Sequence, residues 1–189
     1  TAIRKAVKLP ISLKTRLGPN PQVSTWKETL KRAEDAGINA ITFHARYTSQ
    51  GHAGTVHYDT LAEIVQSTSL PIYGNGSIIN KTSAEKMAST GVKALLIARA
   101  AMENPAIFDF KPIQAYTFAC EHLELEKRYR KIAEKFSRLS ADKATVLTFR
   151  KHIFRYFKGL PGANTLRGNL MNFHSCKEIY DAIEKFTHI

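Results

Sequence analysis

The sequence is poor in cysteine and contains no long apolar run. Its two cysteines, Cys120 and Cys176, lack the spacing of metal ligands, and so few cysteines are typical of a reducing compartment. No apolar stretch approaches the length of a membrane span, and the N-terminus has no signal-peptide pattern. We therefore expect no metal site, no membrane partner and a cytoplasmic location, with the nucleus and the mitochondrion left open. Because the first residue is Thr1 rather than Met, we also expect a part of a longer protein.

Acidic residues are also scarce. The 189 residues include 28 Lys and Arg but only 16 Asp and Glu, which gives a formal net charge of +12. The excess is spread over both halves of the chain. Such an excess favours a polyanionic partner, above all nucleic acid. The alternative is a basic surface without such a partner, because net charge bears on association and not on fold.

Strand and helix patterns alternate through residues 1–112. Strands are predicted at 10–17, 39–44, 70–73 and 94–98, with helices between them at 25–37, 59–67 and 82–90. This βα rhythm predicts an α/β fold, and four such units amount to half of a (β/α)8 TIM-type barrel. A small open, doubly wound sheet of four strands is the alternative.

The pattern changes after residue 112, where only helices are predicted. In 122–140 an apolar stripe recurs at helical spacing through Leu125, Tyr129, Ile132, Phe136 and Leu139. A second helix is expected at 142–158, then a loop over 159–168 and a last helix at 175–186. Residues 113–189 are therefore predicted to form a small all-α domain with a basic exterior.

Three helices are expected to begin at a capping box, in which a Ser or Thr is followed three residues later by Glu. The pairs are Thr25 with Glu28, Thr82 with Glu85, and Ser175 with Glu178. In each pair the two side chains would bond reciprocally to the backbone N–H groups that the first helical turn leaves without partners.

Basic side chains mark the inner face of the first two predicted strands. Ile11, Leu13 and Leu17 occupy one face of the first strand, and Ile41 with Phe43 one face of the second. If these faces pack on helices, Lys14, Arg16 and His44 lie on the opposite face, near the carboxyl ends of the strands where barrel chemistry takes place. Such cations are costly without an anion. A bound phosphate or anionic ring would supply it, and a structural ion pair is the alternative.

Two loops that follow apolar strands have the composition of a phosphate-binding site. The first is Tyr73-Gly74-Asn75-Gly76-Ser77, in which glycines allow backbone to approach a ligand closely. The second contains Ala98-Arg99, whose guanidinium can bind a phosphate through two N–H groups. In (β/α)8 barrels the loops after strands 7 and 8 bind phosphate, so these are interpreted as the last two loops of a barrel and residues 1–112 as its C-terminal half.

Four ordered motifs give the chain a resemblance to a known family. They are Lys14-x-Arg16-Leu17-Gly18, Ile41-Thr42-Phe43-His44-Ala45-Arg46, Gly74-Asn75-Gly76-Ser77 and Ile97-Ala98-Arg99-Ala100-Ala101-x-x-Asn104-Pro105-x-Ile107-Phe108. Together they resemble the tRNA-dihydrouridine synthases, which are flavin-dependent reductases of uridine in tRNA. The Ala-Arg-Ala-Ala form is most similar to the eukaryotic branch that modifies position 20 of the D-loop.

The resemblance implies an FMN-bearing barrel followed by a helical tRNA-binding domain. It implies that Lys14 and His44 contact the isoalloxazine side, and that Asn75, Gly76, Ser77, Ala98 and Arg99 hold the FMN phosphate. NAD(P)H would reduce the flavin, which would then deliver hydride to the uracil C5=C6 bond of an extruded base. The residues predicted to contact RNA or substrate are Arg16, Arg46, Arg150, Lys151 and Arg155.

The sequence departs from the family pattern at two points. Ala98 stands where a glycine is usual, which restricts the approach of backbone to the phosphate. The family's proton-donating cysteine belongs to the first half of the barrel, so no catalytic residue is assigned in this chain and neither Cys120 nor Cys176 takes that role. We expect the isolated chain to be inactive, and its partners to include tRNA and either the missing N-terminal half or a second copy.

Two other functions stay open. The first is a non-catalytic basic RNA-binding module, with the half-barrel as scaffold. Flavin binding separates it from the synthase. The second is a different FMN or phosphate barrel that acts on a small metabolite, although such a barrel has no need of a basic helical tail.

Overall fold

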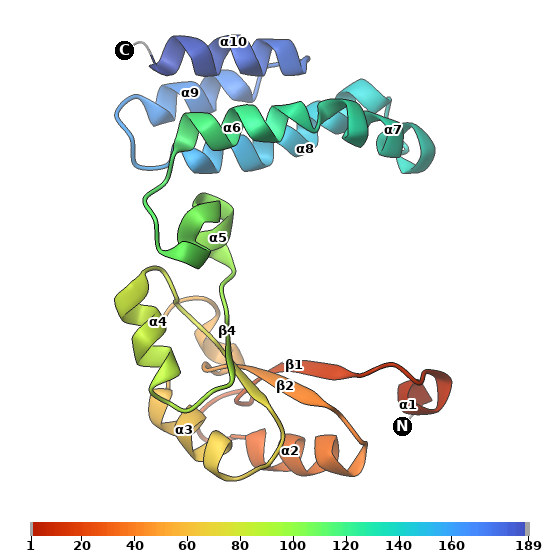
Figure 1. The fold of residues 1–189 in the computed structure, drawn as a ribbon, viewed down its shortest axis with the longest axis vertical. Coiled ribbons are helices and arrows are strands. Elements are labelled where there is room, and N and C mark those ends of the chain that lie inside the picture. Colours follow the sequence, from red (N-terminus) through yellow and green to blue (C-terminus); the bar gives the residue numbers. More distant parts are fainter. Residues whose placement is uncertain (1, 188–189) are drawn as a thin grey trace. The chain divides into compact units, whose positions relative to one another are not determined.

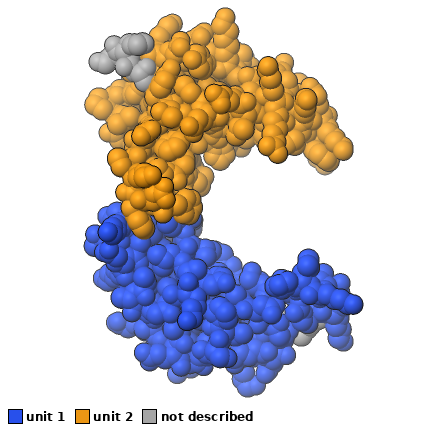
Figure 2. All heavy atoms as spheres, in the orientation of Figure 1, with its two compact units in different colours: residues 1–98 blue, residues 99–189 orange. Residues whose placement is uncertain are grey.

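The computed structural model describes residues 2–187 and divides the chain into two compact units, residues 1–98 and residues 99–189 (Figure 1, Figure 2). The first unit is an α/β fold and the second contains only helices among its described residues. Their junction, between Ala98 and Arg99, precedes the functional boundary expected between residues 112 and 113. The assignment of functional domains to 1–112 and 113–189 stays a prediction.

The first unit contains a parallel sheet of four strands, in agreement with the predicted alternation. After the short α1 (Ala2–Ala6), the strands lie in the order β1-β2-β3-β4. Their bounds are β1 Ser12–Arg16, β2 Ala40–His44, β3 Ile72–Asn75 and β4 Ala94–Leu96. The strand order has no reversal, whereas a doubly wound sheet reverses at its switch point. It is consistent with part of a TIM-type barrel, in which successive strands are neighbours.

Three helices connect the strands, and their apolar faces pack on one face of the sheet. These helices are α2 (Trp26–Asp35), α3 (Tyr58–Gln66) and α4 (Lys81–Ala88), and a 3-10 helix, η1 (Thr48–Gln50), follows β2. Ile41 and Phe43 of β2 are fully buried in the same cluster as Leu30, Leu61 and Met87 of the helices. Ile41 and Phe43 therefore face the helices, as the alternation along β2 predicts.

The capping boxes predicted for α2 and α4 are wrong. Thr25 does precede α2, but its side chain makes no capping hydrogen bond, and Glu28 pairs with Arg32 instead. Helix α4 begins earlier than expected, with Asn80 as its cap, because Asn80 and Ser83 form a reciprocal box of their own. Local partners other than the predicted ones therefore occupy Glu28 in α2 and set the start of α4.

The second unit begins with two short helices and continues with five longer ones. The short ones are α5 (Arg99–Glu103) and the 3-10 helix η2 (Pro105–Asp109). The others are α6 (Ala115–Glu124), α7 (Glu126–Phe136), α8 (Ala141–Tyr156), α9 (Ala163–Leu170) and α10 (Cys176–Thr187). None of the helices described in this structure has both the length and the apolar character to cross a bilayer.

Two expectations for the second unit are wrong and one is confirmed. The single helix expected over 122–140 is interrupted at Leu125, which ends α6 and precedes α7. The loop expected over 159–168 includes the start of α9. The capping box of α10 is confirmed, since Ser175 Oγ accepts from the Glu178 N–H while a Glu178 oxygen accepts from the Ser175 N–H.

The apolar stripe predicted on 122–140 does not serve as core along its whole length. The core of the second unit is formed by α8, α9 and α10, with Phe149, Ile153 and Ile179 fully or almost fully buried. Ile132 and Phe136, by contrast, are 50% and 73% exposed. The stripe therefore leaves an apolar surface on α7.

Candidate functional site

The carboxyl ends of the strands bring together the residues that the sequence singles out. Arg16, His44, Asn75 and Leu96 stand side by side in the register of the sheet, each as the last residue of its strand. The Asn75 side chain donates from Nδ2 to the Leu96 carbonyl at 2.8 Å. Parallel strands thus place this row at one edge, which is where ligands bind in open and closed α/β folds.

The row carries positive charge on the face opposite the helices. Because Ile41 and Phe43 face the helical core, the alternation along β2 places His44 on the other face, and register adds Lys14 and Arg16 of β1. Lys14 is exposed, Arg16 is half-buried and His44 is 8% exposed. Within residues 2–187, neither Lys14 nor Arg16 forms an ion pair with a carboxylate. The face is therefore suited to an anionic ligand.

His44 is neutral at physiological pH. Its pKa is lowered from 6.5 to about 4, first by burial and then by the charges of Arg16, Lys14 and Arg46 and by His52. Its ring stacks with that of His52 at 6.4 Å between centroids. A neutral imidazole carries one donor and one acceptor, so His44 can hydrogen-bond a polar ring system without adding charge.

Arg46 lies inside the first unit, two residues beyond His44. Its side chain is 4% exposed, and its Nε and Nη2 donate to the Gly54 carbonyl at 3.0 and 2.8 Å. Nη2 also donates to Ser77 Oγ at 2.8 Å, and Nη1 lies 3.3 Å from His44 Nε2. The structure thus brings Arg46 together with the predicted cofactor-binding residues, whereas its predicted contact with RNA stays a prediction.

The turn after β3 has the backbone geometry of a close approach. Gly76 has φ +140°, and a Cβ there would lie 3.3 Å from His44 Cδ2. Ser77 has φ +50°, a rare value for a residue other than glycine. Gly74 has a different reason to be glycine, because a Cβ would lie 2.8 Å from the Met87 side chain of α4.

This turn and the cationic face together fit a phosphate-bearing, anionic cofactor. Successive backbone N–H groups in such turns form anion-binding concavities. Lys14 and Arg16 can balance the charge of the ligand, and the neutral ring of His44 lies against Gly76. Ala98 follows β4 and Arg99 begins α5, and both are exposed. Their contact with a phosphate stays a prediction.

The three remaining basic residues predicted to contact RNA belong to α8. Lys151 is exposed, while Arg155 is half-buried with its guanidinium over the Phe154 ring at 5.7 Å. Arg150 donates from Nη1 to the Met171 carbonyl at 2.8 Å. Only Lys151 is therefore fully presented to solvent, and the RNA contact of all three stays a prediction.

Both cysteines belong to the second unit, and the surroundings of Cys176 do not favour a thiolate. Burial, more than any neighbouring charge, raises the pKa of the Cys176 thiol to about 11. Cys176 opens α10 and Cys120 lies in α6, both in the second unit. Since the thiolate is the reactive form, Cys176 is suited to a place in the core rather than to catalysis.

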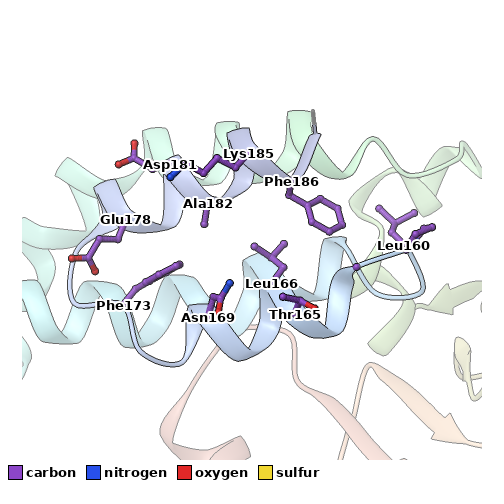
Figure 3. A pocket seen from close by; sticks show the side chains of 12 residues that line it. Leu160, Thr165, Leu166, Asn169, Phe173, Glu178, Asp181, Ala182, Lys185 and Phe186 are labelled. Atoms are coloured by element: carbon purple, nitrogen blue, oxygen red, sulfur yellow. The ribbon is translucent and has the colours of Figure 1, made fainter. Parts of the chain in front are cut away.

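A cavity that the sequence did not predict lies in the second unit, along α9 and α10 (Figure 3). Its volume is about 810 Å³. Apolar side chains dominate its lining, among them Leu160, Leu166, Phe173 and Phe186, and Figure 3 shows Glu178, Asp181 and Lys185 on the α10 side. No sequence pattern predicts this cavity, because residues 159–168, which include the start of α9, are expected to form a loop.

Comparison with known proteins matches nearly the whole chain to one protein family. The family model described as "Dihydrouridine synthase (Dus)" matches residues 1–188. The tRNA-dihydrouridine synthase B of Pseudomonas aeruginosa is 34% identical over 88% of this chain and 52% of its own length. That of Proteus vulgaris is 30% identical over 98% of this chain and 59% of its own length.

The relatives also show how much of a full-length family member this chain covers, and from which organisms similar proteins come. A probable tRNA-dihydrouridine synthase of Rickettsia conorii is 30% identical over 89% of this chain and 53% of its own length. The chain thus spans about half the length of the curated relatives it matches. All three relatives are bacterial, so the likeness to the eukaryotic branch stays a prediction.

Proposed function

The chain belongs to the dihydrouridine synthase family, and we propose that it is the C-terminal portion of an FMN-dependent tRNA-dihydrouridine synthase. In this proposal residues 1–112 are the second half of a (β/α)8 barrel, and residues 113–189 are a helical tRNA-binding domain. The reaction is the reduction of a uridine C5=C6 bond in the tRNA D-loop, with NAD(P)H as reductant. The observation that carries the proposal is the row Arg16–His44–Asn75 beside the Gly76–Ser77 turn.

The proposed cofactor contacts follow from charge and backbone geometry. FMN supplies hydride transfer when it is bound. The phosphate would be held by the backbone of Asn75, Gly76, Ser77 and Ala98 and by the Arg99 guanidinium. Lys14 and His44 would lie beside the ring, where a cation and a neutral imidazole can each hydrogen-bond a polar edge.

The proposed tRNA contacts are electrostatic. Arg150, Lys151 and Arg155 of α8 would bind phosphates, and Arg16 would act at the edge of the sheet beside the base. The target base must leave its stack to reach a flavin at the strand ends. The net charge of +12 supports a polyanionic substrate.

The proposal includes a partner for the sheet. The edges of β1 and β4 and the cationic face would be covered by the remaining half of a barrel, or by a second copy of this chain. Turnover would also need the family's proton-donating cysteine, which we place in that other half. We therefore propose that this chain binds cofactor and tRNA without completing the reaction alone.

Titration of the purified chain with FMN, followed by visible absorbance and flavin fluorescence, tests the proposal. We expect saturable binding that Lys14→Ala weakens and that Lys31→Ala, a charge-matched change at an exposed position of α2, leaves intact. Binding that is absent from a folded sample, or equal in both variants, would refute this cofactor site. A steep salt dependence of tRNA binding in such a sample would favour the non-catalytic RNA-binding module.

A further inference from the structure

One buried guanidinium joins three segments of the first unit. Arg46 follows β2, Gly54 belongs to the loop between η1 and α3, and Ser77 belongs to the turn between β3 and α4. Arg46 donates to the carbonyl of Gly54 and to the hydroxyl of Ser77, and its Nη1 faces the ring of His44. Few side chains could replace it, because a lysine ammonium lacks the planar fork that reaches several acceptors at once.

The contact between Arg46 and His44 determines which ring nitrogen of His44 carries the proton. A guanidinium has five N–H donors and no acceptor, and it stays protonated in proteins. A favourable contact between Arg46 Nη1 and His44 Nε2, 3.3 Å apart, therefore requires that Nε2 carry a lone pair. The single proton of the neutral ring must then be on Nδ1.

The other ring nitrogen remains available to a ligand. Within residues 2–187, His44 Nδ1 has no hydrogen-bond partner, and no buried side-chain nitrogen or oxygen lacks one. Nδ1 is therefore reached by solvent. An N–H at this position is a donor, while the opposite tautomer would present an acceptor there.

We propose that Arg46 is a positioning residue that holds His44 as the Nδ1–H tautomer and fastens the Ser77 turn, so that this edge presents a donor to its ligand. The sequence predicts an RNA contact for Arg46, and its burial within the first unit supports this positioning role in addition. The tautomer stands on the contacts above. Its consequence, a hydrogen bond donated to an acceptor on the FMN ring system, rests on the proposed function.

The Ser77 contact gives the same side chain a second effect. Ser77 adopts φ +50°, which costs free energy unless surrounding contacts hold it. The hydrogen bond from Arg46 Nη2 is such a contact, and it joins residues 31 positions apart in the sequence. Loss of Arg46 would leave the Ser77 turn and the Gly54 loop free to relax together.

Nitrogen-15 NMR of the histidine rings in the ligand-free chain tests the tautomer directly. In the wild-type protein at pH 7 we expect Nδ1 of His44 to be protonated and Nε2 to be bare. Arg46→Gln is expected to give a mixture of tautomers. The matched control is Arg16→Gln, which also removes a positive charge that acts on His44 but no hydrogen bond to its ring.

The groups that face His44 set the expected titration in these variants. Lys14 and Arg16 of β1, Arg46 and His52 all lower its pKa, so either substitution raises it, while only Arg46→Gln changes the tautomer. Arg46→Lys keeps the charge without the fork, so we expect the same mixture of tautomers without the rise in the pKa of His44. This variant replaces Arg46→Gln if Arg46→Gln does not fold. A wild-type ring protonated on Nε2, or a tautomer unchanged in the Arg46 variants, would overturn the proposal.

FMN titration of the same proteins separates this inference from the proposed function. We expect Arg46→Gln to weaken FMN binding by about twofold or more, because a mixture of tautomers leaves only part of the population with a donor at Nδ1 and the Ser77 turn is then free to relax. The expected tautomer in a wild-type chain that binds no FMN would refute the cofactor and leave the role of Arg46 standing. FMN binding with the wrong tautomer would do the reverse.

Discussion

The side chain of Asn75, the last residue of β3, donates a hydrogen bond of 2.8 Å to the main-chain carbonyl of Leu96, the last residue of β4. Asn75 is also the register partner of His44. A buried amide thus ties the carboxyl ends of two neighbouring strands together beside the Gly76–Ser77 turn. This side-chain hydrogen bond extends the pairing of β3 with β4 at the carboxyl end of β4.

Replacing Asn75 with Ala should destabilise the first unit by about 1–3 kcal/mol, because a half-buried carbonyl loses its donor. Urea unfolding followed by fluorescence of the single tryptophan, Trp26, measures the change, since Trp26 is buried in this unit. Gln66→Ala is the control, as its amide is exposed at the end of α3. Equal stability of both variants would show that the Asn75 bond contributes nothing.

The turn at Gly76 offers a test of backbone strain. Gly76→Ala would place a Cβ against His44 at a φ that favours glycine alone, so we expect a loss of about 1–3 kcal/mol and weaker FMN binding. Gly51→Ala separates strain from crowding, because Gly51 has φ +57° and open space around its Cβ. Unfolding and FMN titration of both variants decide the matter. A Gly51→Ala variant with the same loss of FMN affinity would remove Gly76 from the site.

The strand framework was predictable from sequence because its signals are local. Period-two alternation in the first two strands and the regular return of apolar segments predicted all four strands of the sheet, although β3 ends at Asn75, two residues later than expected. The alternation of β2 also predicted the face of His44. The cap at Ser175 was predictable for the same reason, since its partner Glu178 is three residues away.

The position of Arg46 was not predictable, because its partners are far away in the sequence. Ser77 is 31 residues distant, and Gly54 acts through its carbonyl, which any residue would offer. The stripe on α7 failed for a related reason. Helical spacing shows that apolar residues share a face, but not whether a neighbouring helix covers that face.

The second unit should lose stability as pH falls below about 6.5. His122 accepts or donates at Nδ1 with the Tyr156 hydroxyl, stacks on His152 and packs against Phe149. Burial, with the charge of His152 as a lesser cause, lowers the pKa of His122 in the folded state. The unfolded chain therefore binds more protons as pH falls from the ordinary value of 6.5 toward the folded pKa, and stability is lost over that window.

Urea unfolding followed by helical circular dichroism between pH 5.5 and 7.5 measures this dependence. His122→Gln should reduce the slope without abolishing it, because the pKa values of His152 and of His44 in the first unit are lowered too and keep part of it. Glu121→Gln, an exposed change on the same helix, should keep the wild-type slope. A wild-type slope that His122→Gln leaves unaltered would exclude His122 as its origin.

Reversing two charges on α8 should weaken tRNA binding without affecting flavin. Lys151→Glu with Arg155→Glu removes two proposed phosphate contacts, and each contact contributes about 0.7–0.9 to the salt slope of binding. Binding of an unmodified tRNA transcript at several salt concentrations measures both affinity and slope. The control is Lys5→Glu with Lys8→Glu, the same charge change at two exposed residues of the first unit. Equal losses in both pairs would make the effect one of net charge and not of α8.

Because the apolar stripe on α7 is exposed, we expect it to tolerate polar substitutions with little loss of stability. Ile132→Ser with Phe136→Ser should change the free energy of unfolding by no more than about 0.5 kcal/mol per site, as for surface positions. Phe149→Ala, at a side chain only 2% exposed, should cost about 3–5 kcal/mol. Urea unfolding followed by circular dichroism compares them. If the two α7 substitutions cost as much stability as Phe149→Ala, the stripe would be buried in solution, as the sequence pattern predicts for residues 122–140.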